Sequence, residues 1–208
     1  MQEITVRKIE QNEKAIIKEI AKIHVETFQG FFLTFMGKGF LNTMYRAYCN
    51  HEPSTLLGAF DQDGKILGFL AYSTDMSGLY KFMIKRSLIP FAWYSFCAFL
   101  RKPTVFMRLI RAFLKPSEAK REEKYIELSS IGVEPTAKSK GVGTKLINHL
   151  KEIEKSSDCE YICLETDAEN NDGANAFYLK NGFKLEREYT TKENRKMNEY
   201  RYYLEKTE

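Results

Sequence analysis

The sequence predicts an α/β (α+β) fold in which a mixed β-sheet is flanked by helices. Three observations lead to this prediction. The chain has 208 residues, enough for one domain with a substantial core. Apolar residues recur with helix and strand periods in alternation along the chain. Neither internal repeats nor a low-complexity linker divides it, so residues 1–208 are expected to form a single domain.

The first part of the chain is expected to supply a strand, two helices and a hairpin. Residues 4–9 alternate in polarity, and residues 13–28 place isoleucines near helical spacing after Asn12, a candidate N-cap. A second helix is expected around residues 40–48. The turn Asp61-Gln-Asp-Gly64 separates apolar runs at 55–60 and 65–72, and so predicts a hairpin.

A basic and aromatic insertion follows over residues 77–122 and is expected to form two or three helices broken near its prolines. Within it, residues 81–115 carry eight basic side chains and no acidic one: Lys81, Lys85, Arg86, Arg101, Lys102, Arg108, Arg111 and Lys115. We interpret the insertion as a helical cap whose aromatic side chains form a core and whose basic side chains extend to water. A dimer interface and a peripheral membrane contact remain open alternatives.

The rest of the chain is expected to alternate strands and helices before it ends in two strands. The expected elements are a strand at 125–133, a helix at 141–155, a strand at 161–165, a short helix at 173–181, and strands at 184–189 and 200–205.

A glycine loop precedes the expected helix at 141–155. It consists of Lys138, Ser139, Lys140, Gly141, Val142, Gly143 and Thr144. The first turn of a helix has unpaired N–H donors and a partial positive charge, so this loop favours a phosphate or pyrophosphate. The spacing fits neither a Walker A loop nor a dinucleotide fingerprint, because Leu146 stands where the latter needs glycine. A simple glycine turn before a surface helix is the alternative.

The strand before that loop changes its side-chain parity. Ile126 and Leu128 share one face, whereas Ile131 and Val133 fall on the other in a regular strand. One extra residue near Ser129-Ser130, a β-bulge, would realign the two pairs and leave backbone groups unpaired. The alternative is a regular strand that is buried on both faces.

A third motif spans Asn171 to Phe183. Apolar residues at helical spacing are followed by Asn181-Gly182, which is typical of a helix C-terminus. Tyr178 would lie near that end, where its hydroxyl could reach a cleft or its ring could pack in the core.

Together these motifs resemble the GNAT (Gcn5-related N-acetyltransferase) superfamily. The loop at 138–143 is similar to its pyrophosphate loop, with Lys138 in the first place, and the run from Asn171 to Phe183 is similar to its later motif. The resemblance is strong over 123–190 and topological over 1–75. It implies a mostly antiparallel mixed sheet with the helical insertion before its central strand.

The resemblance also implies roles for individual residues. Backbone groups of Ile131, Gly132 and Val133 would hold the pantetheine arm and thioester of acetyl-CoA, and backbone N–H groups from Ser139 to Thr144 would bind its pyrophosphate. Asn171 would contact the coenzyme arm. Tyr178 would protonate the leaving thiolate, and Glu127 matches the position of a catalytic base. An ion-paired or solvated Glu127 is the alternative.

We therefore predict an acyltransferase that moves an acetyl group from acetyl-CoA to a primary amine of a small molecule by direct attack on the thioester. An anionic acceptor such as an amino sugar or sugar nucleotide would suit the basic insertion. A non-catalytic acyl-CoA-binding module and a protein or peptide amine acetyltransferase are the alternatives.

The composition also limits the ligands and the cellular compartment that we expect for this protein. The net charge of +4 is too small to predict nucleic-acid binding, and no metal site is expected because His24, His51 and His149 are isolated. The four cysteines form no CxxC pair and are expected to be reduced. The N-terminus begins directly with the first strand and no apolar run has membrane-spanning length, so we expect a cytoplasmic protein.

Overall fold

The computed structural model describes residues 3–104, 106–107, 123–138, 140–191 and 194–205. Ser139 of the predicted loop and most of the second half of the insertion, 105 and 108–122, lie outside the described residues.

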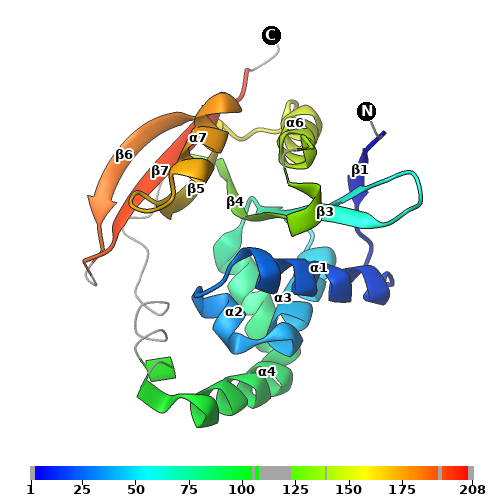
Figure 1. Ribbon diagram of the computed structural model, residues 1–208, viewed down its shortest axis with the longest axis vertical. Helices are drawn as coiled ribbons and strands as arrows, with labels where there is room; N and C mark the ends of the chain where they lie inside the picture. Colours follow the sequence, from blue (N-terminus) through cyan, green and yellow to red (C-terminus); the bar gives the residue numbers. More distant parts are fainter. Residues whose placement is uncertain (1–2, 105, 108–122, 139, 192–193, 206–208) are drawn as a thin grey trace.

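A seven-stranded sheet forms the centre of the molecule, in the order β1-β2-β3-β4-β5-β7-β6 (Figure 1). Its strands are β1 (Thr5–Lys8), β2 (Ser54–Phe60), β3 (Ile66–Ser73), β4 (Tyr125–Val133), β5 (Tyr161–Asp167), β6 (Lys184–Thr190) and β7 (Lys196–Tyr203). Only β4 and β5 pair in parallel; the other neighbours are antiparallel. The predicted mixed, mostly antiparallel sheet is therefore confirmed.

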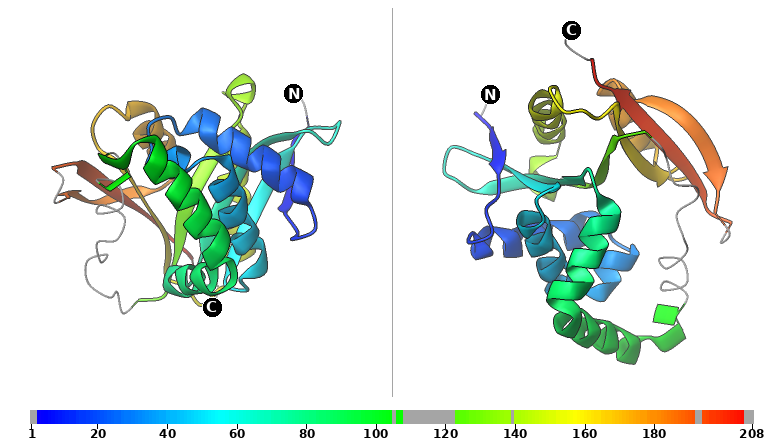
Figure 2. Two further views of the ribbon diagram at one scale, coloured as in Figure 1. Left: turned by 90° about the horizontal axis from the view of Figure 1, so that it is seen from below. Right: turned by 180° about the vertical axis from the view of Figure 1, so that it is seen from behind.

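Helices cover both faces of this sheet (Figures 1 and 2). One face carries α1 (Lys14–Thr27), α2 (Phe32–Met36), α3 (Lys38–Asn50) and α4 (Met76–Arg101); the other carries α6 (Val142–Glu154) and α7 (Asp172–Lys180). A short 3-10 turn, Pro135–Ala137, precedes the glycine loop.

Alternation along the central strands sends neighbouring side chains into two different cores. Leu57 and Leu70 pack with Leu146 of α6, whereas Leu56 and Phe69 belong to the cluster of α1 and α3. Because both faces are covered, β2 and β3 are buried along almost their whole length. This explains why the two strands of the predicted hairpin read as nearly continuous apolar runs.

Some boundaries differ from the sequence-based expectation. Helix α1 begins one residue later than predicted, with Glu13 and not Asn12 as its N-cap. The last strand begins at Lys196, because the polar segment before Tyr200 pairs with both β5 and β6. Helix α2 was not predicted: it has five residues and ends at Gly37, whose φ of 92° stops it.

The described start of the insertion is one long helix with a kink. Helix α4 runs from Met76 to Arg101 through Pro90, and its only non-helical backbone lies at Ser87 (φ −136°, ψ 27°). A proline inside a helix lacks an N–H and clashes with the carbonyl four residues earlier, so the bend falls in the turn before Pro90. The first half of α4 packs on α3 through Leu79 and Met83.

Candidate active site

The predicted β-bulge is present in β4. Ala71 pairs with Ser130 and Tyr72 pairs with Leu128, so Ser129 is an extra residue with no partner in β3. The insertion realigns the strand, and Ile131 and Val133 pack against the same core as Ile126 and Leu128. The parity change in the sequence therefore located the bulge correctly.

Strands β4 and β5 separate after Glu127, just before the bulge. Their parallel pairing covers Tyr125 to Glu127, after which β5 continues along β7 to Asp167 and β4 continues along β3 to Val133. The second half of β4 thus has a strand neighbour on one side only in the described part of the chain.

The ladder shows which backbone groups face this opening. The N–H of Glu134 donates to Leu67 at 2.8 Å, and antiparallel residues alternate between facing their partner and facing away. Gly132 therefore turns its backbone groups toward β3, while Ile131 and Val133 turn theirs toward the opening. The Val133 carbonyl accepts a hydrogen bond from Thr27 Oγ1 at 3.3 Å. Gly132 also lacks space for a side chain, because an added Cβ would lie 2.6 Å from the Phe69 ring.

The glycine loop leads into the N-terminus of α6. Gly141 adopts the left-handed conformation (φ 79°, ψ 6°) immediately before Val142, the first helical residue. The N–H groups of Val142, Gly143 and Thr144 belong to the first turn, where a helix offers no acceptor of its own. Lys138 and Lys140 are exposed beside it.

The two glycines of this loop have different roles. Gly141 supplies a positive φ, and open space surrounds it. Gly143 permits close packing instead, since an added Cβ would lie 3.0 Å from the Phe177 ring of α7. The loop is thereby held against the helix that carries Tyr178. Lys145 points elsewhere, donating to the Ile4 carbonyl at 3.2 Å.

Helix α7 ends as predicted and positions Tyr178 in the core. The N–H of Phe183 donates to the Tyr178 carbonyl at 3.1 Å, and Gly182 has a φ of 80°, which together form a Schellman-type end. The Tyr178 ring contacts Phe177, Phe183 and Tyr200, and 8% of the residue is exposed. Burial raises the pKa of Tyr178 well above its ordinary value, so the hydroxyl stays protonated.

Asn171 fixes the start of the same helix. Its side-chain amide donates to Thr166 Oγ1 at 2.7 Å and to the Asp167 carbonyl at 3.3 Å. Asn175, one turn later, donates to the same carbonyl at 3.0 Å. The end of β5 and the start of α7 are thus joined by two asparagines, which places Asn171 at the β5 side of the opening.

Glu127 projects from the opposite face of the sheet to Ile126 and Leu128, toward α3 and α4. Its negative charge contributes to raising the pKa of Tyr48 and of Tyr80, whose main cause is burial. Ser129 Oγ lies 3.4 Å from the Met76 sulfur, and Tyr48 Oη lies 4.0 Å from it. Glu127 therefore lies among side chains from α3, the start of α4 and the bulge.

Sequence reasoning did not identify Tyr48, Tyr80 or Met76 as site residues. The spacing of Tyr48 indicated only a buried helix face, and Tyr80 lies in the insertion. Glu127 and these three residues come from one strand and two helices. Because only the tertiary fold brings them together, no local sequence pattern could predict this group.

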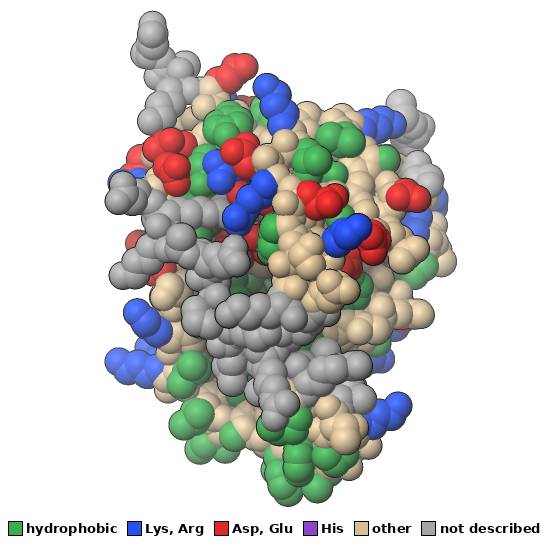
Figure 3. Space-filling model, turned by 90° about the vertical axis from the view of Figure 1, so that its left-hand side faces the viewer, with side chains coloured by type: hydrophobic (Ala, Val, Ile, Leu, Met, Phe, Trp, Pro, Cys, Tyr) green, Lys and Arg blue, Asp and Glu red, His purple; other side chains and the backbone are tan. Residues whose placement is uncertain are grey.

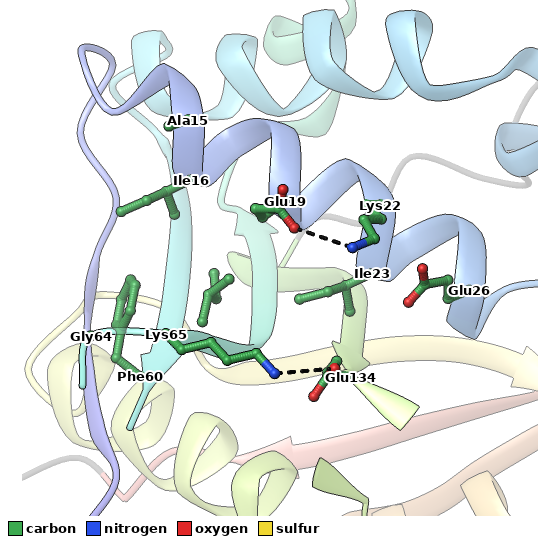
Figure 4. Close-up of a pocket in the computed structure, with 11 residues that line it drawn as sticks. Ala15, Ile16, Glu19, Lys22, Ile23, Glu26, Phe60, Gly64, Lys65 and Glu134 are labelled. Atoms are coloured by element: carbon green, nitrogen blue, oxygen red, sulfur yellow. Dashed lines mark hydrogen bonds and ion pairs between the residues drawn. The ribbon is translucent and has the colours of Figure 1, made fainter. Parts of the chain in front are cut away.

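A hollow of about 390 Å³ lies away from these residues, between α1 and the turn that joins β2 and β3 (Figure 4). Lys65 spans it to reach Glu134 at 3.4 Å, and Lys22 pairs with Glu19 at 3.7 Å on its rim. None of the predicted catalytic or coenzyme-binding residues lines it.

The described residues contain no cluster of three or more His, Cys, Asp or Glu side chains suited to a metal ion. Within the same residues, no helix has the length and apolar character required to cross a membrane.

Comparisons with known proteins were made for the sequence and for the fold. Residues 17–183 match the model of the acetyltransferase (GNAT) family. Among curated protein sequences, no significant match was found.

Three solved structures illustrate the similarity of the fold. Arabidopsis thaliana NAA60 in complex with acetyl-CoA superposes with a TM-score of 0.60 at 16% identity, covering 97% of this chain and 99% of that one. The ribosomal-protein-S18-alanine N-acetyltransferase from Escherichia coli gives 0.58 at 15% identity, covering 99% and 97%. A chimera of the spermidine N-acetyltransferase SpeG from Vibrio cholerae and hSSAT gives 0.59 at 12% identity, covering 97% and 95%.

Proposed function

The chain belongs to the acetyltransferase (GNAT) family, and from that premise we propose that it transfers the acetyl group of acetyl-CoA to a primary amine of a small molecule by direct attack on the thioester. The observation that carries this proposal is the opening where β4 and β5 separate beyond Glu127. The N-terminus of α6 and Tyr178 lie on one face of the sheet, in the core that Ile131 and Val133 contact, and Glu127 lies on the other face.

The residues present fit acetyl-CoA. Backbone groups of Ile131 and Val133 face the opening and can pair with the amides of a pantetheine arm. The first-turn N–H groups of Val142, Gly143 and Thr144, with Lys138 and Lys140 beside them, suit a pyrophosphate. Ser139 is included in this proposed loop from the sequence motif. When bound, acetyl-CoA supplies an activated acetyl group with a thiolate leaving group.

We assign the role of general base to Glu127. An alkylamine with a pKa of about 10.4 must lose a proton before it attacks, which at pH 7.4 costs roughly 4 kcal/mol. A carboxylate can take that proton directly or through a water molecule. Glu127 lies beside the bulge, and Ile131 just beyond it turns its N–H toward the opening, where it can stabilise the tetrahedral oxyanion.

We assign the role of general acid to Tyr178. As the tetrahedral intermediate collapses, the carbon–sulfur bond breaks and the thiolate takes the hydroxyl proton, leaving the acetylated amine and CoA. The raised pKa of Tyr178 keeps its hydroxyl protonated, so a proton is present when the thiolate forms. Asn171 would hold the coenzyme arm on the β5 side.

For the acceptor, we propose a small primary amine that enters past Tyr48, Tyr80 and Met76. The charge of Glu127 acts on both Tyr48 and Tyr80, and Met76 contacts Ser129 of the bulge, so these side chains lie on the Glu127 face of the sheet. The cations of the insertion favour an anionic acceptor, such as an amino sugar or sugar nucleotide. We propose, as the sequence suggested, that the insertion at 77–122 forms a cap on the acceptor side of the site. A protein or peptide amine is the second candidate, because the E. coli neighbour is named as a ribosomal-protein-S18-alanine N-acetyltransferase.

A panel of amines assayed with acetyl-CoA and thiol detection tests the proposal. The panel should contain amino sugars, sugar nucleotides, polyamines and amino-terminal peptides. We expect thiol release with a small amine and acetylated product by mass spectrometry. Binding of CoA with no turnover on any amine would instead support a non-catalytic acyl-CoA-binding module, and turnover on peptides alone would support the second candidate.

A further inference from the structure

The outer side of helix α4 carries an unusually apolar surface. Its exposed large side chains include Ile89 (82% exposed), Leu100 (62%), Trp93 (61%) and Leu88 (60%). Figure 3 shows hydrophobic side chains gathered at the lower end of the molecule, where Figure 1 places α4. A contiguous exposed apolar patch usually marks a surface that binds a partner.

The inner side of the same helix is already occupied. Leu79 and Met83 in its first half are fully or nearly fully buried on the α3 side, and Ala98 is buried near its end. The exposed apolar side chains therefore form a second face of α4, separate from the side that packs on α3. The bend at Ser87, before Pro90, divides the helix, and most of the exposed apolar residues lie beyond it.

Charge along the helix indicates what the partner is. Residues 87–100 carry no charge, while Lys81, Lys85 and Arg86 precede them and Arg101 and Lys102 follow. No acidic residue occurs from Met76 to Ser117. An apolar stretch with tryptophan at its centre and cations at both ends is complementary to a surface that has an apolar interior and an anionic boundary.

Two other partners fit less well. A second copy of this chain would bring the same cations to the contact, so the ends of the two helices would repel each other. A nucleic acid would attract the cations and could stack on Trp93, but it offers nothing to bury Leu88, Ile89 and Leu100.

We propose that α4 binds the surface of an anionic lipid bilayer, lying in the plane of the interface with Leu88, Ile89 and Trp93 in its apolar layer. Lys85, Arg86, Arg101 and Lys102 then meet lipid phosphates. At 1.5 Å per residue, Ile89 lies roughly 14 Å along the helix from Tyr80 beside Glu127. The proposed acceptor site therefore opens close to the membrane, although the docking itself does not depend on the proposed reaction.

Flotation of the full-length protein with vesicles tests this inference. We expect it to float with vesicles of phosphatidylcholine containing about 30% phosphatidylglycerol at low salt, and far less with phosphatidylcholine alone. Each cation near an anionic surface contributes roughly a fivefold factor in partitioning, so Lys85→Gln with Arg86→Gln should weaken binding roughly 25-fold. The matched control Lys14→Gln with Lys18→Gln, on exposed positions of α1, removes the same charge and should change it little.

A second pair of variants tests the apolar contribution. Ile89→Ser with Trp93→Ser removes two exposed side chains, so folding should be unaffected, and binding to the anionic vesicles should fall at least tenfold. No flotation of the parent, or equal losses for the α4 and α1 charge variants, would overturn the inference. Concentration-dependent dimerisation abolished by the serine variant would assign the face to self-association instead. Acetyl transfer to a soluble amine without vesicles, measured on the same variants, reports separately on the proposed function.

Discussion

Lowering the pH should destabilise this protein through one buried histidine. His24 is 3% exposed, and its Nδ1 lies 2.6 Å from the hydroxyl of Tyr45, which is fully buried. Its ring also lies against Phe28 and Phe69. Among the described residues, its Nε2 is buried with no hydrogen-bond partner. Burial lowers the pKa of His24 from 6.5 to about 4, so the folded protein holds it neutral.

The size of the effect follows from that difference. The unfolded chain takes up a proton near pH 6.5 and the folded chain only near pH 4, so the unfolded state binds more protons in between. The contribution of neutral His24 to the free energy of unfolding is therefore fully present above pH 6.5 and is lost as the pH falls toward 4. A difference of 2.5 pKa units corresponds to roughly 3.4 kcal/mol in all, of which about 2 kcal/mol is lost between pH 7 and pH 5.

Urea unfolding at pH 7, 6 and 5 measures this loss. The double variant His24→Phe with Tyr45→Phe removes the titrating ring together with the tyrosine hydroxyl that it contacts. Its free energy of unfolding should fall about 2 kcal/mol less than that of the parent over this range. His149→Gln, a histidine substitution at a half-buried position of α6, is the control. Parallel curves for the parent and the double variant would refute the reasoning.

Three further predictions concern the proposed reaction. Tyr178→Phe keeps the ring contacts and should lower kcat by about 10²- to 10⁴-fold with little change in the Kd for CoA; a kcat within twofold of the parent, where chemistry limits the rate, would leave Tyr178 as a packing residue. Glu127→Gln should remove the acidic limb of the pH–rate profile, and an unaltered profile would assign the base to another group. Gly143→Ala should disturb both CoA affinity and stability, because its Cβ meets the Phe177 ring, whereas Gly141→Ala meets no neighbour and should act through backbone strain alone. Calorimetry with CoA and thermal melts measure the two effects in both glycine variants and the parent. Equal losses of CoA affinity and of thermal stability in the two variants would contradict this prediction.

The coenzyme half of the candidate site could be predicted from sequence because its signals are local. A change of parity over eight residues located the bulge, and two glycines at a strand-to-helix junction located the start of α6. Asn181-Gly182 likewise gave the end of α7. In each case the residues that define the feature are neighbours in the chain, so propensity and period are sufficient.

The acceptor half could not be predicted in the same way. Tyr48, Tyr80 and Glu127 come from α3, α4 and β4, and only tertiary packing brings them together. In helix α4, by contrast, the break that the prolines indicated is present, because the backbone at Ser87 is non-helical shortly before Pro90. The His24–Tyr45 pair also joins two helices, which an isolated histidine in a sequence cannot reveal.

The bulge in β4 is difficult to explain as a requirement of folding. Without Ser129, regular alternation would still place Ile126, Leu128, Ile131 and Val133 on one face, so the same core would form. The extra residue therefore gives the chain no additional burial; Ser129 itself is exposed. What it changes is the course of the backbone just past Glu127, where β4 ceases to pair with β5. A feature that adds nothing to the core but leaves backbone groups of Ile131 and Val133 facing an opening is best explained by what binds there. The bulge and Glu127, the carboxylate that we propose as the base, thus lie in one short segment, and we propose that acetyl transfer takes place there, where β4 ceases to pair with β5.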